Sequence, residues 1–91
     1  MGVVRVKGLE RELKALANRR RLAILVFLKN RGEASVGEIA KEINLSFRST
    51  SRHLAALKAL DIVEHEQRSL QVFYRLPKNQ SSATRHILSL L

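Results

Sequence analysis

The chain has 91 residues, enough for one domain with a small core. Its net charge of +9 indicates a polyanionic partner such as nucleic acid, and the lack of cysteine excludes disulfides, thiolate catalysis and cysteine-bound metal. The longest apolar run, residues 22–28, is too short to cross a membrane, so we expect a cytoplasmic protein with no membrane contact.

The first third of the chain predicts two helices. Apolar and basic residues alternate over part of Val3–Lys7, which suggests an arm or a frayed end. Leucines then recur on one face of a first helix at about 8–17. Asn18 is a suitable N-cap for a second helix over Arg19–Lys29, which is apolar almost all round and should be the most buried. Asn30–Gly32 predicts the end of that helix.

Two short helices follow at about 36–60. Ser35 and Glu38 have the spacing of a capping box, in which each side chain accepts from the backbone N–H of the other residue. Gly37, in the same turn, suggests a close approach to another element. Asn44 predicts a left-handed end to the first of the two helices. Two short helices joined by a tight turn are typical of a helix-turn-helix.

The stretch Leu45–Leu60 predicts a recognition helix. Ser46 can cap it, and one apolar face carries Thr50, Leu54 and Leu57. The opposite face is basic, which suits either an ordinary solvated surface or a DNA groove, where arginine binds guanine edges and serine reaches phosphates or bases. The candidate groove contacts are Phe47, Arg48, Ser49, Ser51, Arg52 and His53. Arg48 and Arg52 are the better candidates for base edges.

Phe47 allows two interpretations. Its ring could touch a thymine methyl group or staple the turn to the helix, and we favour the staple. The arginines at the start of the second helix also have two interpretations, phosphate contacts or a charged helix start in water. The candidate phosphate contacts are Arg19, Arg20, Arg21 and Lys41.

After Leu60 the spacing of the apolar residues changes from that of a helix to that of a strand. Asp61 stands where a glycine would suit a left-handed helix end. Ile62–Gln67 and Gln71–Leu76 predict a β-hairpin with its turn at residues 68–70, a wing at about 62–76. A last helix capped by Ser81 or Ser82 follows. The expected fold is mainly α with a small β-hairpin, a single winged helix-turn-helix domain over 1–91 in the order α-α-α-α-β-β-α.

Three segments between Leu13 and Leu76, LKALANRRRLAIL, SRHLAALKALDIV and VFYRL, resemble the ArsR family of winged-helix repressors. The resemblance implies a transcription regulator, a repressor, that binds an inverted repeat in double-stranded DNA as a homodimer. It also implies a dimer interface made by the first and last helices, at about 8–17 and 81–91. Their apolar faces favour the same interface, although packing within one subunit would also cover them. The predicted interface residues are Leu9, Leu13, Leu16, Ile87, Leu88 and Leu91.

The chain departs from the family pattern at its metal sites and in its wing. The paired cysteines of many members correspond to Ser35 and Gly37, and the last helix offers only His86, so we expect no family-type metal site and no cofactor. The sequence identifies no effector. The wing carries glutamates that are unfavourable beside phosphate, so contact through its candidate DNA ligand Arg68 is less secure than contact through the recognition helix.

Two other classes of function remain open at this stage. The same fold could serve as an architectural or protein-interaction module without base readout. An enzyme is the weakest alternative, because the serines have no evident Asp–His pairing and the carboxylates form no inward pair. We therefore expect that the chain is not an enzyme.

Overall fold

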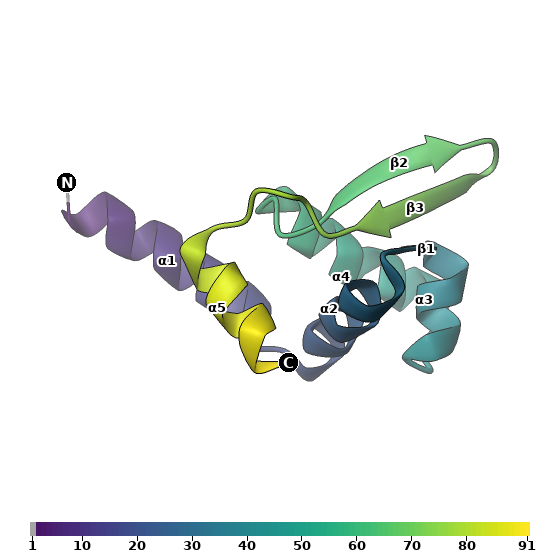
Figure 1. The fold of residues 1–91 in the computed structure, drawn as a ribbon, viewed down its shortest axis with the longest axis horizontal. Coiled ribbons are helices and arrows are strands. Elements are labelled where there is room, and N and C mark those ends of the chain that lie inside the picture. Colours follow the sequence, from purple (N-terminus) through teal and green to yellow (C-terminus); the bar gives the residue numbers. More distant parts are fainter. Residues whose placement is uncertain (1) are drawn as a thin grey trace.

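A computed structural model describes residues 2–91, which form five helices and one three-stranded antiparallel sheet (Figure 1). The helices are α1 (Gly2–Leu16), α2 (Arg19–Arg31), α3 (Val36–Glu42), α4 (Phe47–Ala59) and α5 (Ser82–Leu90). The strands are β1 (Glu33–Ser35), β2 (Glu64–Arg68) and β3 (Gln71–Arg75). The predicted winged helix-turn-helix fold is confirmed, with β1 as an additional strand between α2 and α3.

The predicted helix ends are confirmed. The Asn18 side chain accepts from the first backbone N–H groups of α2. At the start of α3, Ser35 Oγ accepts from Glu38 N at 3.2 Å, and Glu38 Oε1 accepts from Ser35 N at 2.9 Å. Asn44 and Asp61 have φ angles of 55° and 57°, the left-handed conformation expected of residues that end a helix. These local signals therefore set the lengths of α2, α3 and α4.

The core lies around α2, which contacts each of the other four helices and β1. The predicted inner face of α4 is confirmed, since Thr50, Leu54 and Leu57 are fully buried. This face fixes α4 against the body and leaves its other side exposed. The largest buried side chains are Ile24, Leu25, Leu28, Ile39, Leu54, Leu57, Ile62 and Val63.

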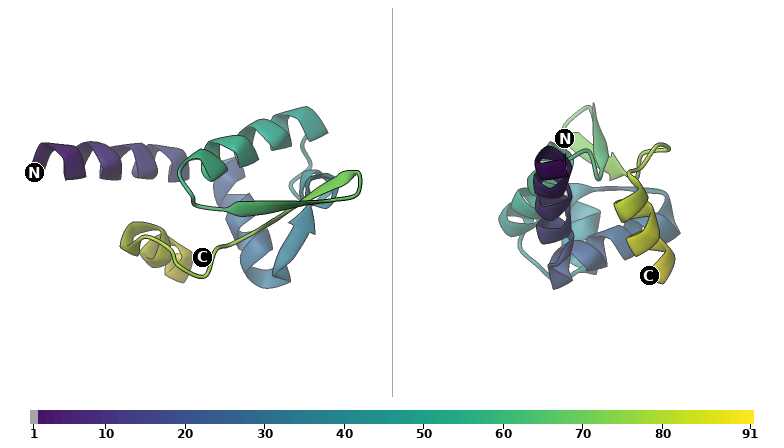
Figure 2. Two further views of the ribbon diagram at one scale, coloured as in Figure 1. Left: turned by 90° about the horizontal axis from the view of Figure 1, so that it is seen from above. Right: turned by 90° about the vertical axis from the view of Figure 1, so that its left-hand side faces the viewer.

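The first helix is longer than predicted. Residues 3–7 continue α1 as helix, so the prediction of an arm or frayed end is wrong: their apolar positions join those of residues 9 and 13 in one helical pattern. Between Gly2 and Lys14, every residue except Glu12 is exposed. In Figure 2, α1 accordingly extends well beyond the rest of the molecule. The longest dimension of the molecule, α1 included, is 43 Å.

Glu12 connects α1 to α5. Its carboxylate accepts from the hydroxyl of Ser81, the N-cap of α5, and from Thr84 Oγ1 at 2.5 Å. Thr84 is buried, and the carboxylate lies at the positive end of the α5 dipole, so this contact orients α5 along α1.

The sheet has the strand order β1-β3-β2, and the predicted hairpin is confirmed with a two-residue turn at 69–70. Tyr74 at the centre lies opposite Ala34 on one side and His65 on the other. Ala34 and Tyr74 are buried against the helices, so residues at alternate positions face outward. Gly37 has nothing within 4 Å of where a Cβ would be, so the predicted close approach there is wrong.

No helix among residues 2–91 combines the length and the apolar character that a membrane crossing requires.

Candidate nucleic-acid interface

The exposed side of α4 carries the basic pair that the sequence singled out. Arg48 and Arg52 are both exposed and, four residues apart, lie on one face of the helix. Within residues 2–91 neither takes part in an ion pair. Ser46 Oγ caps the helix by accepting from Ser49 N at 3.0 Å, and Ser49 and Ser51 are half-buried. The buried face of α4 therefore holds the helix in place, while its outer face presents Arg48 and Arg52 to a ligand.

Phe47 does not staple the turn to the helix. It is the first residue of α4, whereas a staple requires the residue before the N-cap, and its side chain is 62% exposed. The preferred sequence interpretation is therefore wrong. The ring lies at the amino end of the exposed face, next to Arg48, where it is open to an apolar contact from outside.

His53 is linked to α2 rather than standing free. Arg21 Nε donates to His53 Nδ1 at 3.1 Å, and Arg21 Nη1 donates to the Ala15 carbonyl at 3.3 Å. Burial, followed by the charges of Arg21 and Arg20, lowers the pKa of His53. The imidazole is therefore neutral at pH 7, and because Nδ1 accepts, its proton sits on Nε2.

The arginines at the start of α2 have separate roles. Arg19 is exposed, as is Lys41 on α3. Arg20 instead donates through Nη1 to the carbonyl of Ile43, the C-cap residue of α3, at 3.0 Å. One donor of its guanidinium is thus engaged by a helix end that favours positive charge, and its assignment as a phosphate contact stays a prediction.

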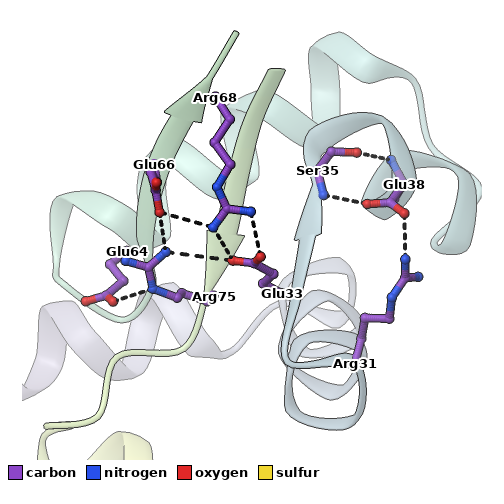
Figure 3. A network of polar contacts seen from close by, with 8 residues as sticks. All are labelled: Arg31, Glu33, Ser35, Glu38, Glu64, Glu66, Arg68 and Arg75. Atoms are coloured by element: carbon purple, nitrogen blue, oxygen red, sulfur yellow. Dashed lines mark hydrogen bonds and ion pairs between the residues drawn. The ribbon is translucent and has the colours of Figure 1, made fainter. Parts of the chain in front are cut away.

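The wing arginines lie in a network of ion pairs on the outer face of the sheet (Figure 3). Arg68 donates to both oxygens of Glu33, at 2.7 and 3.0 Å, and to Glu66 at 3.1 Å. Arg75 lies 2.7 Å from Glu64, 3.2 Å from Glu66 and 3.8 Å from Glu33. Hydrogen bonds from these guanidinium groups lower the pKa of Glu33 and Glu66. The candidate DNA ligand Arg68 is therefore already engaged by two carboxylates.

The predicted dimer residues fall into two groups. Leu9, Leu13 and Leu91 have 47%, 43% and 42% of their surface exposed. Leu16 and Leu88 are buried in the core of the subunit, at 3% and 7%, so their assignment to a dimer interface is wrong. Ile87 is partly buried and packs against the same core. Further exposed apolar residues on α1 and α5 are Val3, Val4, Val6 and Leu90.

A thiolate metal site does not fit the start of α3. Ser35 is buried and its hydroxyl is committed to the capping box, and Gly37 offers no side chain. No group of three or more histidine, cysteine, aspartate or glutamate residues that could bind a metal ion is present among residues 2–91.

Comparisons with known proteins agree with this geometry. Residues 18–65, more than half of the chain, match the sequence model of the family described as "Bacterial regulatory protein, arsR family". The transcriptional activator HlyU of Vibrio cholerae is 40% identical over 76 residues, which cover 84% of this chain and 69% of HlyU.

Solved structures extend the similarity over almost the whole chain. NolR from Sinorhizobium fredii superposes with a TM-score of 0.82 at 29% identity, over 98% of this chain and 85% of NolR. The homodimeric winged helix-turn-helix DNA-binding domain Mb0332 from Mycobacterium bovis has a TM-score of 0.81 at 30% identity, over 98% and 79% of the two chains. The family match covers the helix-turn-helix described above and extends into β2, the first wing strand. The chain therefore belongs to the arsR family of bacterial regulatory proteins.

Proposed function

We propose that the chain is a sequence-specific DNA-binding transcription regulator that acts as a homodimeric repressor on an inverted-repeat operator. One observation carries the proposal: Arg48 and Arg52 are exposed on the side of α4 opposite its buried face and form no ion pair within residues 2–91. A helix presented in this way fits the major groove, where an arginine donates two hydrogen bonds to O6 and N7 of guanine.

The neighbours of this pair provide further contacts. The exposed ring of Phe47 is suited to a thymine methyl group. His53 has Nε2–H as a donor to phosphate, since Nδ1 already accepts from Arg21. Arg19 and Lys41 are exposed at the edges of the helix-turn-helix and suit phosphates on either side of the groove. The net charge of +9 supplies the long-range attraction to the duplex.

The homodimer is supported by α1. A shallow hollow of about 350 Å³ on this helix is lined by Val6, Leu9, Leu13 and Ala17 with two charged residues at its rim. Such an apolar stripe on a projecting helix suits a second copy of the chain, and the similar domain from Mycobacterium bovis is homodimeric. Two copies of α4 that read successive turns of one groove would lie ~34 Å apart.

The test is selection of bound duplexes from a random pool, followed by titration of the selected sequence across a salt series. We expect an inverted repeat whose half-sites are one helical turn apart. Binding with a steep salt slope but no sequence preference would indicate an architectural protein, and no binding would indicate a protein-interaction module. A reporter gene placed behind the selected operator then tests repression, which an increase in expression would contradict.

A further inference from the structure

The outer face of the sheet has a charge opposite to that of the rest of the molecule. Three glutamates surround two arginines there, which gives this face a net charge of −1 on a chain of net charge +9. The register explains the grouping, because Glu33 and Glu64 both lie opposite Arg75 of the central strand. Residues directly opposite on one face of a sheet are in contact range, so the pattern is built by three strands together.

Arg68 belongs to this network although it stands next to the hairpin turn. It pairs with Gln71 at the end of β2, and the turn beyond it carries Leu70, which is 96% exposed. Its side chain does not continue toward that tip. The guanidinium instead lies 4.7 Å from the centre of the Phe73 ring and reaches across β3 to Glu33 (Figure 3).

Glu33 is the carboxylate that determines this orientation. It binds Arg68 through both oxygens, a bidentate geometry that is stronger and more directional than a single contact. Glu66 contributes one contact to Arg68 and is shared with Arg75. Glu33 also comes from β1, outside the hairpin, so it connects the wing cation to the body of the domain.

We propose that Glu33 withholds Arg68 from DNA and thereby limits the affinity of the regulator. This inference rests on the proposed DNA-binding function. A guanidinium satisfied by carboxylates gains little by exchanging them for a phosphate, and the exchange would leave Glu33 and Glu66 unpaired beside the anionic duplex. The wing therefore adds little attraction, and binding depends on α4.

The experiment compares Glu33→Gln with Glu42→Gln on the selected operator. Both variants remove one negative charge, but Glu42 is exposed and makes no ion pair within residues 2–91, so it controls for net charge alone. We expect Glu33→Gln to bind about 5-fold more tightly than the control, the gain of one hydrogen-bonded contact. The slope of log K against log salt should steepen by about 0.9, the value for one added phosphate contact.

A double-variant cycle assigns the gain to Arg68. Adding Arg68→Gln to Glu33→Gln should abolish the extra affinity, while the same change in the wild type should have a much smaller effect. Glu66→Gln, which removes the charge from the single contact to Arg68, should give an intermediate gain. Circular dichroism and thermal unfolding of each variant verify that the sheet is intact.

The outcomes separate the two proposals. If the wild type binds no duplex, the proposed function fails and the inference fails with it. If the wild type binds its operator but folded Glu33→Gln binds no better than Glu42→Gln, or retains its gain without Arg68, the inference alone is overturned.

Discussion

Arg21 joins three helices through one side chain. Its guanidinium donates to the Ala15 carbonyl near the end of α1 and to His53 in the middle of α4, while its own backbone lies in the first turn of α2. The contact to His53 requires a neutral imidazole, because a protonated Nδ1 would point a second donor at the arginine. The contact between Arg21 and α4 therefore depends on one protonation state.

Stability should consequently depend on pH near neutrality. The folded chain lowers the pKa of His53 below its ordinary value of 6.5, so the unfolded chain binds the proton more strongly. This contribution to stability is fully present above pH 6.5 and is lost as the pH falls through the lowered pKa. We expect the free energy of unfolding, measured with urea, to fall as the pH is lowered below 6.5.

Two variants test that assignment. His53→Gln keeps an acceptor for Arg21 but cannot be protonated, so it should flatten the pH dependence. His86→Gln, at an exposed position of α5, should leave the dependence unchanged. Equal slopes in the two variants would show that the dependence arises elsewhere.

Arg52 should be a determinant of sequence specificity. Because its side chain is exposed and forms no ion pair in the described part of the chain, Arg52→Ala should weaken binding to the selected operator by about 1–3 kcal/mol and relax the preference at one base pair. Lys78→Ala removes the same charge from an exposed loop residue at the base of the wing and serves as the control. Anisotropy titrations on matched and mismatched duplexes measure both effects. An equal loss on the two duplexes would make Arg52 a phosphate contact.

At the scale of single elements, α3 depends on its capping box. The helix has seven residues, too few to be stable alone, and its first turn is closed by the reciprocal bonds of Ser35 and Glu38. We expect Ser35→Ala to lower the free energy of unfolding by about 1 kcal/mol in urea titrations. Ser82→Ala, at an exposed first-turn position of α5, should have little effect. Equal losses would mean that the cap contributes nothing beyond helix propensity.

The elements that sequence predicts well are those specified by neighbouring residues. Asn18, the Ser35–Glu38 pair, Asn44 and Asp61 all act within a few residues of the backbone that they terminate. The three residues of β1 carry no such signal, because their partner strand lies some forty positions later. A strand so short is defined by its pairing and not by its own pattern.

The site shows the same division between local and distant partners. The exposed arginines of α4 follow from helical periodicity around the buried face, which the sequence contains. The partners of Arg20, Arg21 and Arg68 lie 23, 32 and 35 positions away, so a basic run alone cannot distinguish a structural cation from a ligand-binding one. For the same reason, the leucines of α1 and α5 could not be divided between core and surface.

At the scale of the whole molecule, the exposed face of α1 should control association. Leu13→Asp places a charge in the apolar hollow and should shift sedimentation toward the monomer, with weaker operator binding. Leu70→Asp adds the same charge at the exposed tip of the hairpin, away from α1 and its hollow, and should leave the assembly intact. A dimer that survives Leu13→Asp in a folded variant would move the interface elsewhere.

The projecting turns of α1 also bear on how much folded regulator a cell contains. An isolated helical segment of this length is marginal in water, so the outer turns need a neighbouring surface to persist. If a second copy supplies that surface, the melting temperature rises with protein concentration, and dilution loosens the amino-terminal turns before the core unfolds. The cellular concentration of the protein would then determine both the order of α1 and the occupancy of the operator. Regulation would begin above a threshold concentration, without a small-molecule signal.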